Sequence, residues 1–414
     1  MKELLKTVLL DQQAIRWLDH YIARPFPESF LSSPEIIVIS GIRRCGKSTL
    51  LQQIRSGQTE KHYFLNFDDE RLIHFKVDDF QLLHELLIEL FGKQSVFYFD
   101  EIQNIPGWER FVRRLHDQGN KVFVTGSNAS MLSRELGTRL TGRHFTYHLY
   151  PFSFREYLAF SKETLSPHSL FTTHGRSLLQ QRFHEYLLDG GFPGFLAGKN
   201  PETLNSLYQS IIYRDVMVRN NLSSEKELLE LVWYLASNLA RPSSNNSLAK
   251  RVGIKNATTI KNYFSFLEDT YLLFQLRAFD YSAARQLRLP RKSYFIDNGL
   301  VRAVGFMFSE ETGRLLENLV FLELMRRGQE LFYHSGKQEC DFLVRQKGKI
   351  TQAIQVCHTL DSPETRAREV GGLVEAMTTY HLKEGLILTN YQEETLILPN
   401  GTIHLMPAWK WTLL

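Results

Sequence analysis

Short runs of apolar residues recur through the first third of the chain, and each is followed by a polar segment. Four of them predict β-strands buried on both faces: Ile36–Ile39, Tyr63–Phe67, Ser95–Phe99 and Lys121–Thr125. Between the later strands, apolar positions recur at helical spacing within 82–90 and 111–115. Because strands that alternate with helices form parallel sheets with helices on both faces, we expect an α/β fold in this part of the chain.

The pattern of apolar residues divides the chain into five segments. The N-terminal part is an amphipathic helical segment, the second is the α/β core, and the pattern turns helical after Pro151. The fourth part has two short helices, Ser247–Val252 and Ala257–Thr270, separated by Gly253, which is typical of a winged helix-turn-helix. The last part mixes strands and helices. We place the parts at residues 1–33, 34–150, 151–222, 223–300 and 301–414.

The segment after the first strand carries the most specific chemical signal. It contains Gly41 and Gly46 at the spacing G-x-x-x-x-G-K-S, between a strand and the start of a helix. Glycines let backbone N–H groups turn inward towards an anion, and the helix N-terminus adds partial positive charge. We therefore expect a bound nucleoside triphosphate, with Lys47 on its phosphates and Ser48 on Mg²⁺. The expected nucleotide-binding residues in this loop are Gly41, Arg44, Cys45, Gly46, Lys47, Ser48 and Thr49.

Polar side chains follow the later strands, where a parallel sheet gathers its ligands. Asp100 ends a buried strand, so its carboxylate is expected to orient Mg²⁺, and Glu101 is the expected general base for water. Asn128 follows the fourth strand and either senses the terminal phosphate or is an ordinary turn residue. Arg139 and Arg143 come next; one of them is an arginine finger for a neighbouring subunit, or both lie in a solvated basic loop.

Six motifs together resemble one protein family. They are Gly41-Ile-Arg-Arg-Cys-Gly-Lys-Ser, Asn66-Phe-Asp-Asp, Phe99-Asp-Glu-Ile-Gln, Thr125-Gly-Ser-Asn, Pro151-Phe-Ser-Phe-Arg-Glu-Tyr and Gly190-Gly-Phe-Pro. The chain resembles, over almost its whole length, the bacterial and archaeal AAA+ family of predicted ATPases. The resemblance implies a P-loop AAA+ core, a helical lid, a winged helix and a nuclease-like C-terminal domain. It also implies Mg²⁺-dependent ATP hydrolysis, a Walker B pair at Asp100 and Glu101, a sensor at Asn128 and an adenine contact at Pro193.

The C-terminal part is similar to the PD-(D/E)XK nuclease fold but departs from its motif. Glu317 and Asp341 match the helical glutamate and the strand aspartate of that fold. The next strand carries Gln355 and Cys357, where the fold has a carboxylate and a lysine. Because a neutral amide and a thiol neither hold Mg²⁺ nor assist the attacking water, we predict a degenerate site without nuclease activity. The domain then binds DNA by shape and charge, or only braces an assembly.

Composition narrows the remaining choices. The net charge of +4 and a pI near 8.8 permit a nucleic-acid partner, and Lys250, Lys255, Thr259 and Lys261 of the winged-helix part suit phosphate contacts. In the alternative interpretation, the winged-helix part does not bind DNA and only packs against the α/β core. Three cysteines without paired spacing, together with the absence of a membrane span or secretion signal, predict a cytoplasmic protein.

The sequence therefore predicts an ATPase that works as a homo-oligomer, expected as a hexameric ring, and that remodels DNA, including branched DNA. Two alternatives stay open. One is a nucleotide-dependent switch that recruits a protein partner, and the other is a structure-selective nuclease.

Overall fold

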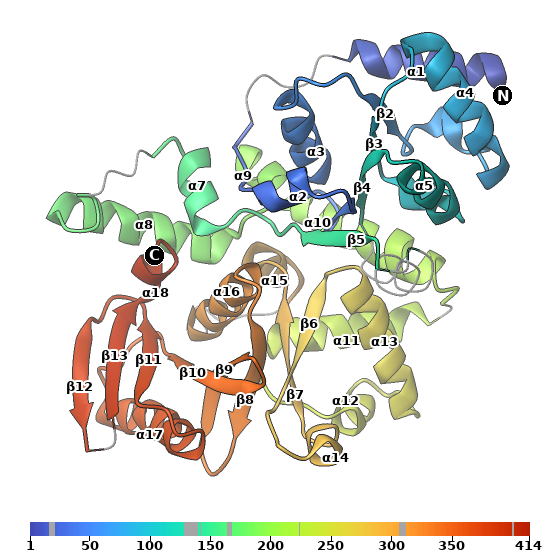
Figure 1. Ribbon diagram of the computed structural model, residues 1–414. Coiled ribbons are helices and arrows are strands. Elements are labelled where there is room, and N and C mark those ends of the chain that lie inside the picture. The colour runs from blue at the N-terminus through green and yellow to red at the C-terminus, as the bar shows by residue number, and fades with distance from the viewer. Residues whose placement is uncertain are drawn as a thin grey trace. The chain divides into compact units, whose positions relative to one another are not determined.

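The computed structural model describes residues 1–15, 21–127, 140, 142–163, 168–222, 224–305, 312–399 and 401–414. Its contacts divide the chain into two compact units, and Figure 1 shows the elements of each. The first unit holds Met1–Tyr150 with Asp269–Tyr271, and the second holds Pro151–Glu268 with Leu272–Leu414. The finer boundaries expected within these units stay predictions.

A five-stranded sheet forms the centre of the first unit. Its strands are β1 (Ile36–Ser40), β2 (Tyr63–Asn66), β3 (Val96–Asp100), β4 (Lys121–Gly126) and β5 (His144–His148). They run in the order β2-β3-β4-β1-β5, and every neighbouring pair is parallel. The predicted parallel α/β sheet is therefore confirmed. This order places β1 beside β4 and β4 beside β3, so the segments that follow these three strands emerge at one edge.

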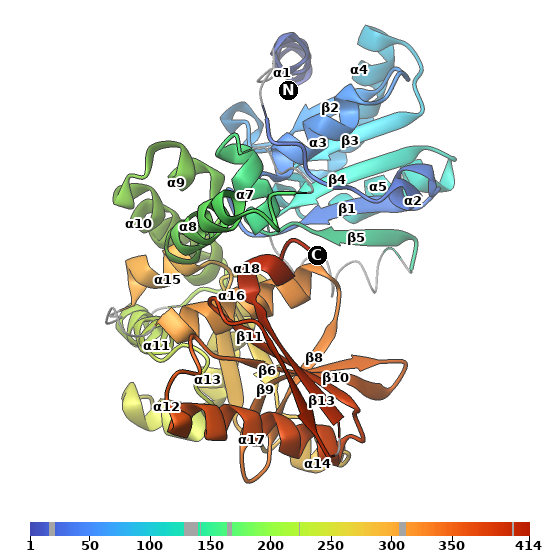
Figure 2. The same cartoon turned by 90° about the vertical axis from the view of Figure 1, so that its left-hand side faces the viewer.

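Helices cover both faces of this sheet. They are α1 (Lys2–Ala14), α2 (Glu28–Ser32), α3 (Lys47–Ser56), α4 (Phe80–Phe91) and α5 (Trp108–Asp117), with short 3-10 helices η1 (Glu70–Leu72), η2 (Val77–Asp79) and η3 (Ile102–Asn104). Helix α3 packs against β1, β3 and β4 on one face, whereas α4 and α5 lie on the other face beside α1 (Figures 1 and 2).

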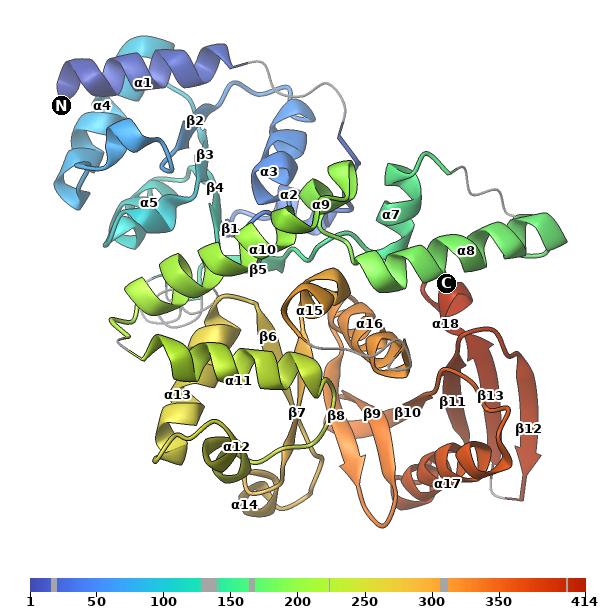
Figure 3. The same cartoon turned by 180° about the vertical axis from the view of Figure 1, so that it is seen from behind.

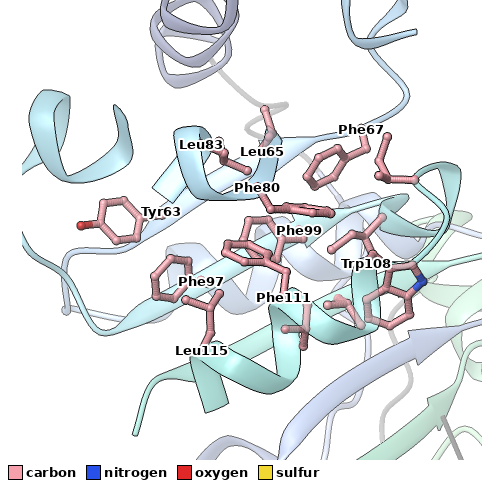
Figure 4. Close-up of a cluster of buried hydrophobic side chains, with 14 of the residues drawn as sticks. Tyr63, Leu65, Phe67, Phe80, Leu83, Phe97, Phe99, Trp108, Phe111 and Leu115 are labelled. Carbon is pink, nitrogen blue, oxygen red and sulfur yellow. The ribbon is translucent and has the colours of Figure 1, made fainter. Parts of the chain in front are cut away.

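The core between the sheet and α4 and α5 is largely aromatic (Figure 4). Phe97 and Phe99 alternate along β3 and point to this face, because every second side chain of a strand lies on the same side. Phe80 of α4 stacks on Phe111 of α5 with ring centroids 4.5 Å apart. Replacing a buried phenylalanine here with alanine costs about 3–5 kcal/mol, so this layer fixes β3 and the acids at its end.

Two features of the first unit differ from the expectation. Strand β5 was not predicted from the sequence, because none of its five side chains is fully buried and it lies at the sheet edge. The N-terminal segment, expected to be an amphipathic helix over 1–33, is helical only in part: α1 ends at Ala14, residues 21–27 lie outside any helix, and α2 begins at Glu28.

Helices fill the first part of the second unit, as the pattern predicts. They are α7 (Phe154–Phe160), α8 (Thr173–Asp189), α9 (Pro193–Gly198), α10 (Pro201–Ser210), a π-helix η5 (Ile211–Val218) and α11 (Glu225–Ser237). Helix α7 begins where the sequence signals it, because Ser153 and Glu156 form a reciprocal capping box.

Two helices and a hairpin follow, and they fit the expected helix-turn-helix. The elements are α12 (Asn245–Arg251), α13 (Ala257–Asp269), β6 (Leu273–Arg277), α14 (Ala283–Gln286), β7 (Arg291–Phe295) and α15 (Asn298–Val304). Gly253 turns the chain between α12 and α13 with φ +71°, and Ile260, Phe264 and Leu267 form a buried stripe on α13. Strands β6 and β7 pair antiparallel. Naming this arrangement a winged helix stays an interpretation.

The C-terminal part is a six-stranded mixed sheet with helices (Figure 3). Its elements are α16 (Thr312–Arg326), β8 (Glu330–Ser335), β9 (Glu339–Gln346), β10 (Lys349–Val356), α17 (Pro363–Thr379), β11 (Glu384–Thr389), β12 (Glu394–Leu398), β13 (Gly401–Pro407) and α18 (Ala408–Trp411). The strand order is β12-β13-β11-β10-β9-β8, and α17 packs across β9, β10 and β11. Across the described part of the chain, none of the helices combines the length and the apolar character that crossing a membrane would need.

Candidate functional site

The loop between β1 and α3 has the backbone of an anion-binding nest. Arg44 and Gly46 both adopt left-handed conformations, with φ of 61° and 104°. Left-handed residues within a short turn direct neighbouring backbone N–H groups towards a common centre. Gly41 is required for a different reason: a Cβ placed on it would lie 2.1 Å from the carbonyl oxygen of Leu149. Both motif glycines are therefore explained by the fold.

Lys47 opens α3 and points back over this loop. Its side chain is only 3% exposed, and its Nζ lies 3.3 Å from the carbonyl oxygen of Ile42 and 3.5 Å from Glu101 Oε1. Burial is the largest single influence and acts to lower the pKa of Lys47, but the nearby negative groups, Glu101 first among them, together outweigh it, so the pKa is raised. The ammonium therefore stays charged inside the loop.

The pKa values of the two acids after β3 are shifted in opposite directions. Asp100 is 1% exposed, and burial followed by the charge of Glu101 raises its pKa. Burial also acts to raise the pKa of Glu101, but the charge of Lys47 and a hydrogen bond from Gln103 outweigh it and lower the pKa. Glu101 is thus held ionised beside Lys47, while Asp100 accepts a hydrogen bond from Ser48.

Thr125 joins the two acids from the neighbouring strand β4. Its hydroxyl donates to Asp100 Oδ1 at 2.5 Å and accepts the backbone N–H of Glu101 at 2.9 Å. Glu101 has a left-handed backbone with φ of 50°, which is uncommon for a residue other than glycine. The hydroxyl therefore stabilises an unfavourable backbone turn that aims Glu101 at Lys47.

Arg24 supports the loop from the segment before α2. It is 7% exposed, and its guanidinium donates to the carbonyl oxygens of Cys45 and Tyr150 at 3.1 and 2.9 Å. The Cys45 thiol is itself buried and donates towards the carbonyl oxygen of Leu149 at 3.4 Å, and burial raises its pKa. Cys45 is thus a packed, protonated thiol in the floor of the loop.

Comparison with known proteins identifies the family. A family model described as an AAA domain matches residues 33–158, and a model described as a domain of unknown function (DUF8612) matches residues 180–311. The uncharacterized protein MJ1544 of Methanocaldococcus jannaschii is 33% identical over 432 aligned residues, which cover 100% of this chain and 96% of that protein. The chain belongs to the family of MJ1544. The first unit of this family member is a P-loop AAA+ ATPase-like domain.

Two further proteins are similar to this chain. An uncharacterized protein of Haemophilus influenzae is 33% identical over 386 residues, covering 88% of this chain and 92% of that protein. The solved structure of the Thermotoga maritima RuvB Holliday junction branch migration motor is 15% identical, with a TM-score of 0.24, and covers 58% of this chain and 82% of that chain.

The fold places only some of the predicted nucleotide-site residues close to one another. Lys47, Ser48, Asp100 and Glu101 gather at one edge of the first sheet, beside the loop residues Gly41 to Gly46 and Thr49. Arg143 lies at the opposite edge, because its carbonyl oxygen accepts the N–H of Ile36 at the start of β1. Pro193 begins α9 in the second unit. Asn128 and Arg139 fall outside the described residues.

Sequence reasoning missed Thr125 and Arg24, and it gave Gln103 little weight. Thr125 is a polar residue at the end of an apolar strand, which is a usable signal once the strand order is known. Arg24 carries no such signal, since it precedes the loop by about twenty positions in a segment without secondary structure.

The C-terminal residues form a second polar cluster in the second unit. Glu317 of α16 and Asp341 of β9 lie on either side of a lysine, with Lys292 Nζ 2.9 and 2.8 Å from their oxygens. Lys292 comes from strand β7, outside the C-terminal sheet. Gln355 accepts the N–H of Asp341 at 3.1 Å and donates to Glu369.

The predicted DNA-binding residues lie around the turn between α12 and α13. Lys250, Lys255 and Lys261 are exposed, and Thr259 is half-buried. Of these four, Lys261 lines a hollow of about 340 Å³, which is also formed by residues 243–246 and 287–289, and the other cationic lining residues are Arg288 and Arg291. No carboxylate belongs to the described lining of this hollow.

Proposed function

We propose that this protein binds ATP with Mg²⁺ at the β1–α3 loop and hydrolyses it. The observation that carries the proposal is the meeting of a buried Lys47 with Glu101 and Asp100 at the end of parallel strands. Buried charges are costly unless they are paired, and a cluster of this kind at a strand edge is typical of a phosphoryl-transfer site.

The residues present fit both the nucleotide and the metal. The left-handed backbone at Arg44 and Gly46 suits a phosphate group, and the Lys47 ammonium adds a positive charge that no change of pH near neutrality removes. Ser48 and Asp100 offer hard oxygen donors, and they already share a hydrogen bond. A bound Mg²⁺ would neutralise the negative charge that develops on the phosphate oxygens.

Glu101 is the group assigned to water activation. Its lowered pKa keeps the carboxylate ionised, and Gln103 and the Thr125 hydroxyl fix its orientation. An ionised carboxylate accepts the proton of the attacking water while the water oxygen bonds to the terminal phosphorus and the bond to ADP breaks.

Substitution of Glu101 and Lys47 tests this assignment. Glu101→Gln is expected to keep ATP binding and to lower turnover by about 10²- to 10⁴-fold, whereas Lys47→Ala is expected to lose ATP binding. Fluorescent ATP-analogue binding and phosphate release measure the two properties separately. Glu60→Gln, an exposed acid in the same unit, is the matched control. Unchanged phosphate release in Glu101→Gln refutes the role of Glu101.

We propose further that hydrolysis is coupled to DNA in an oligomer, expected as a hexameric ring. The support is the hollow whose cationic lining residues are Lys261, Arg288 and Arg291, together with the exposed Lys250 and Lys255 of the same helix-turn-helix. Several cations around one polar hollow suit the phosphates of a nucleic-acid backbone.

Salt-dependent binding to single-stranded, duplex and four-way-junction DNA tests this second step. Each lost phosphate contact lowers the slope of log K against log salt by roughly 0.9, so the double variant Lys261→Ala, Arg288→Ala is expected to lower it by about two. Lys383→Ala removes an exposed charge from the C-terminal part as the control. No binding to these DNAs, together with turnover that DNA does not stimulate, favours a nucleotide-dependent switch instead.

A further inference from the structure

The side chain of Lys292 lies at the centre of three carboxylates in the second unit. It comes from β7 and is 1% exposed, and its Nζ lies 2.7 Å from Glu339, 2.8 Å from Asp341 and 2.9 Å from Glu317. Glu317 belongs to α16, and Asp341 and Glu339 belong to β9. One ammonium therefore links β7, α16 and β9, which are far apart in the sequence.

The carboxylates are further fixed by neighbours that donate hydrogen bonds. The Tyr294 hydroxyl donates to Glu317 Oε1 at 2.6 Å, and the N–H of Val356 donates to Asp341 Oδ2 at 3.0 Å. The ring of Tyr333 lies 5.6 Å from the ammonium of Lys292. Such a shell pre-organises the oxygens around a positive centre.

Lys292 supplies the positive charge that three carboxylates contact. The side chains of Glu317 and Asp341 are only 12% and 7% exposed, whereas that of Glu339 is 42% exposed. Removal of the ammonium therefore leaves Glu317 and Asp341 without this partner in a largely buried site, which is costly.

The ammonium nitrogen lies where oxygens of the three carboxylates converge. Its nitrogen–oxygen distances of 2.7 to 2.9 Å exceed Ca²⁺–oxygen distances of about 2.3–2.6 Å by only a few tenths of an ångström. In the described part of the chain, no group of three or more His, Cys, Asp or Glu side chains is arranged to hold a metal.

We propose that Lys292 is a built-in replacement for a divalent cation, which keeps the site of Glu317, Asp341 and Glu339 closed to metal ions and ties β7 to the C-terminal sheet. The site is a latent cation site, and its ligand class is a hard, oxygen-binding divalent ion of the size of Ca²⁺.

Calcium titration of the full chain without nucleotide tests the proposal. The wild type is expected to show no Asp341-dependent Ca²⁺ binding by calorimetry. Lys292→Ala is expected to have a thermal midpoint lowered by roughly 10 °C, to gain one Ca²⁺ site, and to recover part of the midpoint when Ca²⁺ is added. The double variant Lys292→Ala, Asp341→Asn, which removes a charge from the new site, is expected to lose that binding.

Two results overturn the proposal. One is a folded Lys292→Ala that gains no site, and the other is wild-type Ca²⁺ binding that disappears in Asp341→Asn. If Lys292→Ala does not fold even with Ca²⁺, the comparison of wild type with Asp341→Asn decides alone: absence of Asp341-dependent binding supports the proposal and its presence overturns it.

Discussion

At the scale of single residues, the Thr125 hydroxyl is the most informative contact in the candidate ATPase site. It donates to Asp100 and accepts the N–H of Glu101, whose backbone is left-handed. Thr125→Val keeps the shape and removes both bonds, which costs about 1–3 kcal/mol for each buried group left unpaired. Misplacement of Glu101 is expected to lower turnover by roughly 10- to 100-fold.

Phosphate release and thermal unfolding measure the two effects of Thr125→Val. Thr125→Ser keeps the hydroxyl and is the matched control, expected to retain most of the turnover. A valine variant with wild-type turnover contradicts the positioning role of Thr125.

Local spacing explains which site residues were predictable. Gly41, Lys47 and Ser48 lie within eight positions, and Asp100 and Glu101 follow one apolar strand, so their chemistry is readable without the fold. Thr125 needs the strand order β3-β4-β1, which sequence spacing does not reveal. Lys292 was missed because it reaches Asp341 from 49 positions away, on a strand outside the C-terminal sheet.

At the scale of elements, the junction of β1 and β5 depends on Gly41. A Cβ there would lie 2.1 Å from the carbonyl oxygen of Leu149, whose N–H donates to Ser40 at the end of β1. Gly41→Ala is expected to push these strands apart, to lower the free energy of unfolding by about 1–3 kcal/mol and to weaken ATP binding.

Denaturant unfolding and nucleotide titration measure the effect of Gly41→Ala. Gly57→Ala is the matched control, because the nearest atom to its new Cβ lies at an ordinary 3.6 Å and its φ is negative. Equal stability and equal ATP affinity of the two variants contradict the explanation given for Gly41.

Asp297 joins α15 to the turn between α8 and α9 and makes stability depend on pH. Its carboxylate accepts the N–H groups of Gly191 at 2.6 Å and Leu300 at 3.0 Å. Burial outweighs these bonds and raises its pKa from 3.8 to about 6. Between those values the folded chain holds a proton that the unfolded chain has released, so stability falls as pH rises through this window.

Comparison of wild type with Asp297→Asn isolates this term, because asparagine does not titrate. The difference in free energy of unfolding, wild type minus variant, is expected to fall by roughly 3 kcal/mol from pH 3.5 to pH 7, in proportion to the gap between 3.8 and about 6. Urea unfolding at several pH values measures it. A difference that does not vary with pH contradicts burial as the cause.

Elements were predictable in proportion to their burial. The strands β1, β3 and β4 are apolar runs buried on both faces, whereas β5 reads His-Phe-Thr-Tyr-His and is only half-buried at an edge. Its five residues pair in parallel with β1, and its own composition does not signal that pairing. Strand β7 differs, because four of its five positions are buried, but it is short and carries two basic residues, so its composition does not signal a buried strand.

At the scale of the whole molecule, the position of Arg143 bears on assembly. Its backbone pairs with the start of β1, whereas the phosphate-binding loop follows the end of that strand, roughly 13 Å further along. Its side chain lies 3.3 Å from Asp117 and is 38% exposed. If Arg143 is the arginine finger, it therefore acts on the ATP of another copy of the chain, and the active form is an oligomer.

Mixing two inactive variants tests this arrangement. Lys47→Ala lacks ATP binding and Arg143→Ala is expected to lose about 10³-fold in turnover, so each is inactive by itself. In a mixed oligomer, the intact phosphate-binding loop of an Arg143→Ala subunit meets the intact Arg143 of a Lys47→Ala subunit. Turnover is therefore expected to return. Asp117→Asn frees Arg143 without removing it and is expected to keep turnover. Wild-type turnover in Arg143→Ala, or no recovery on mixing, contradicts an arginine finger at this position, because a finger that acts between subunits is complemented by any partner that still carries it.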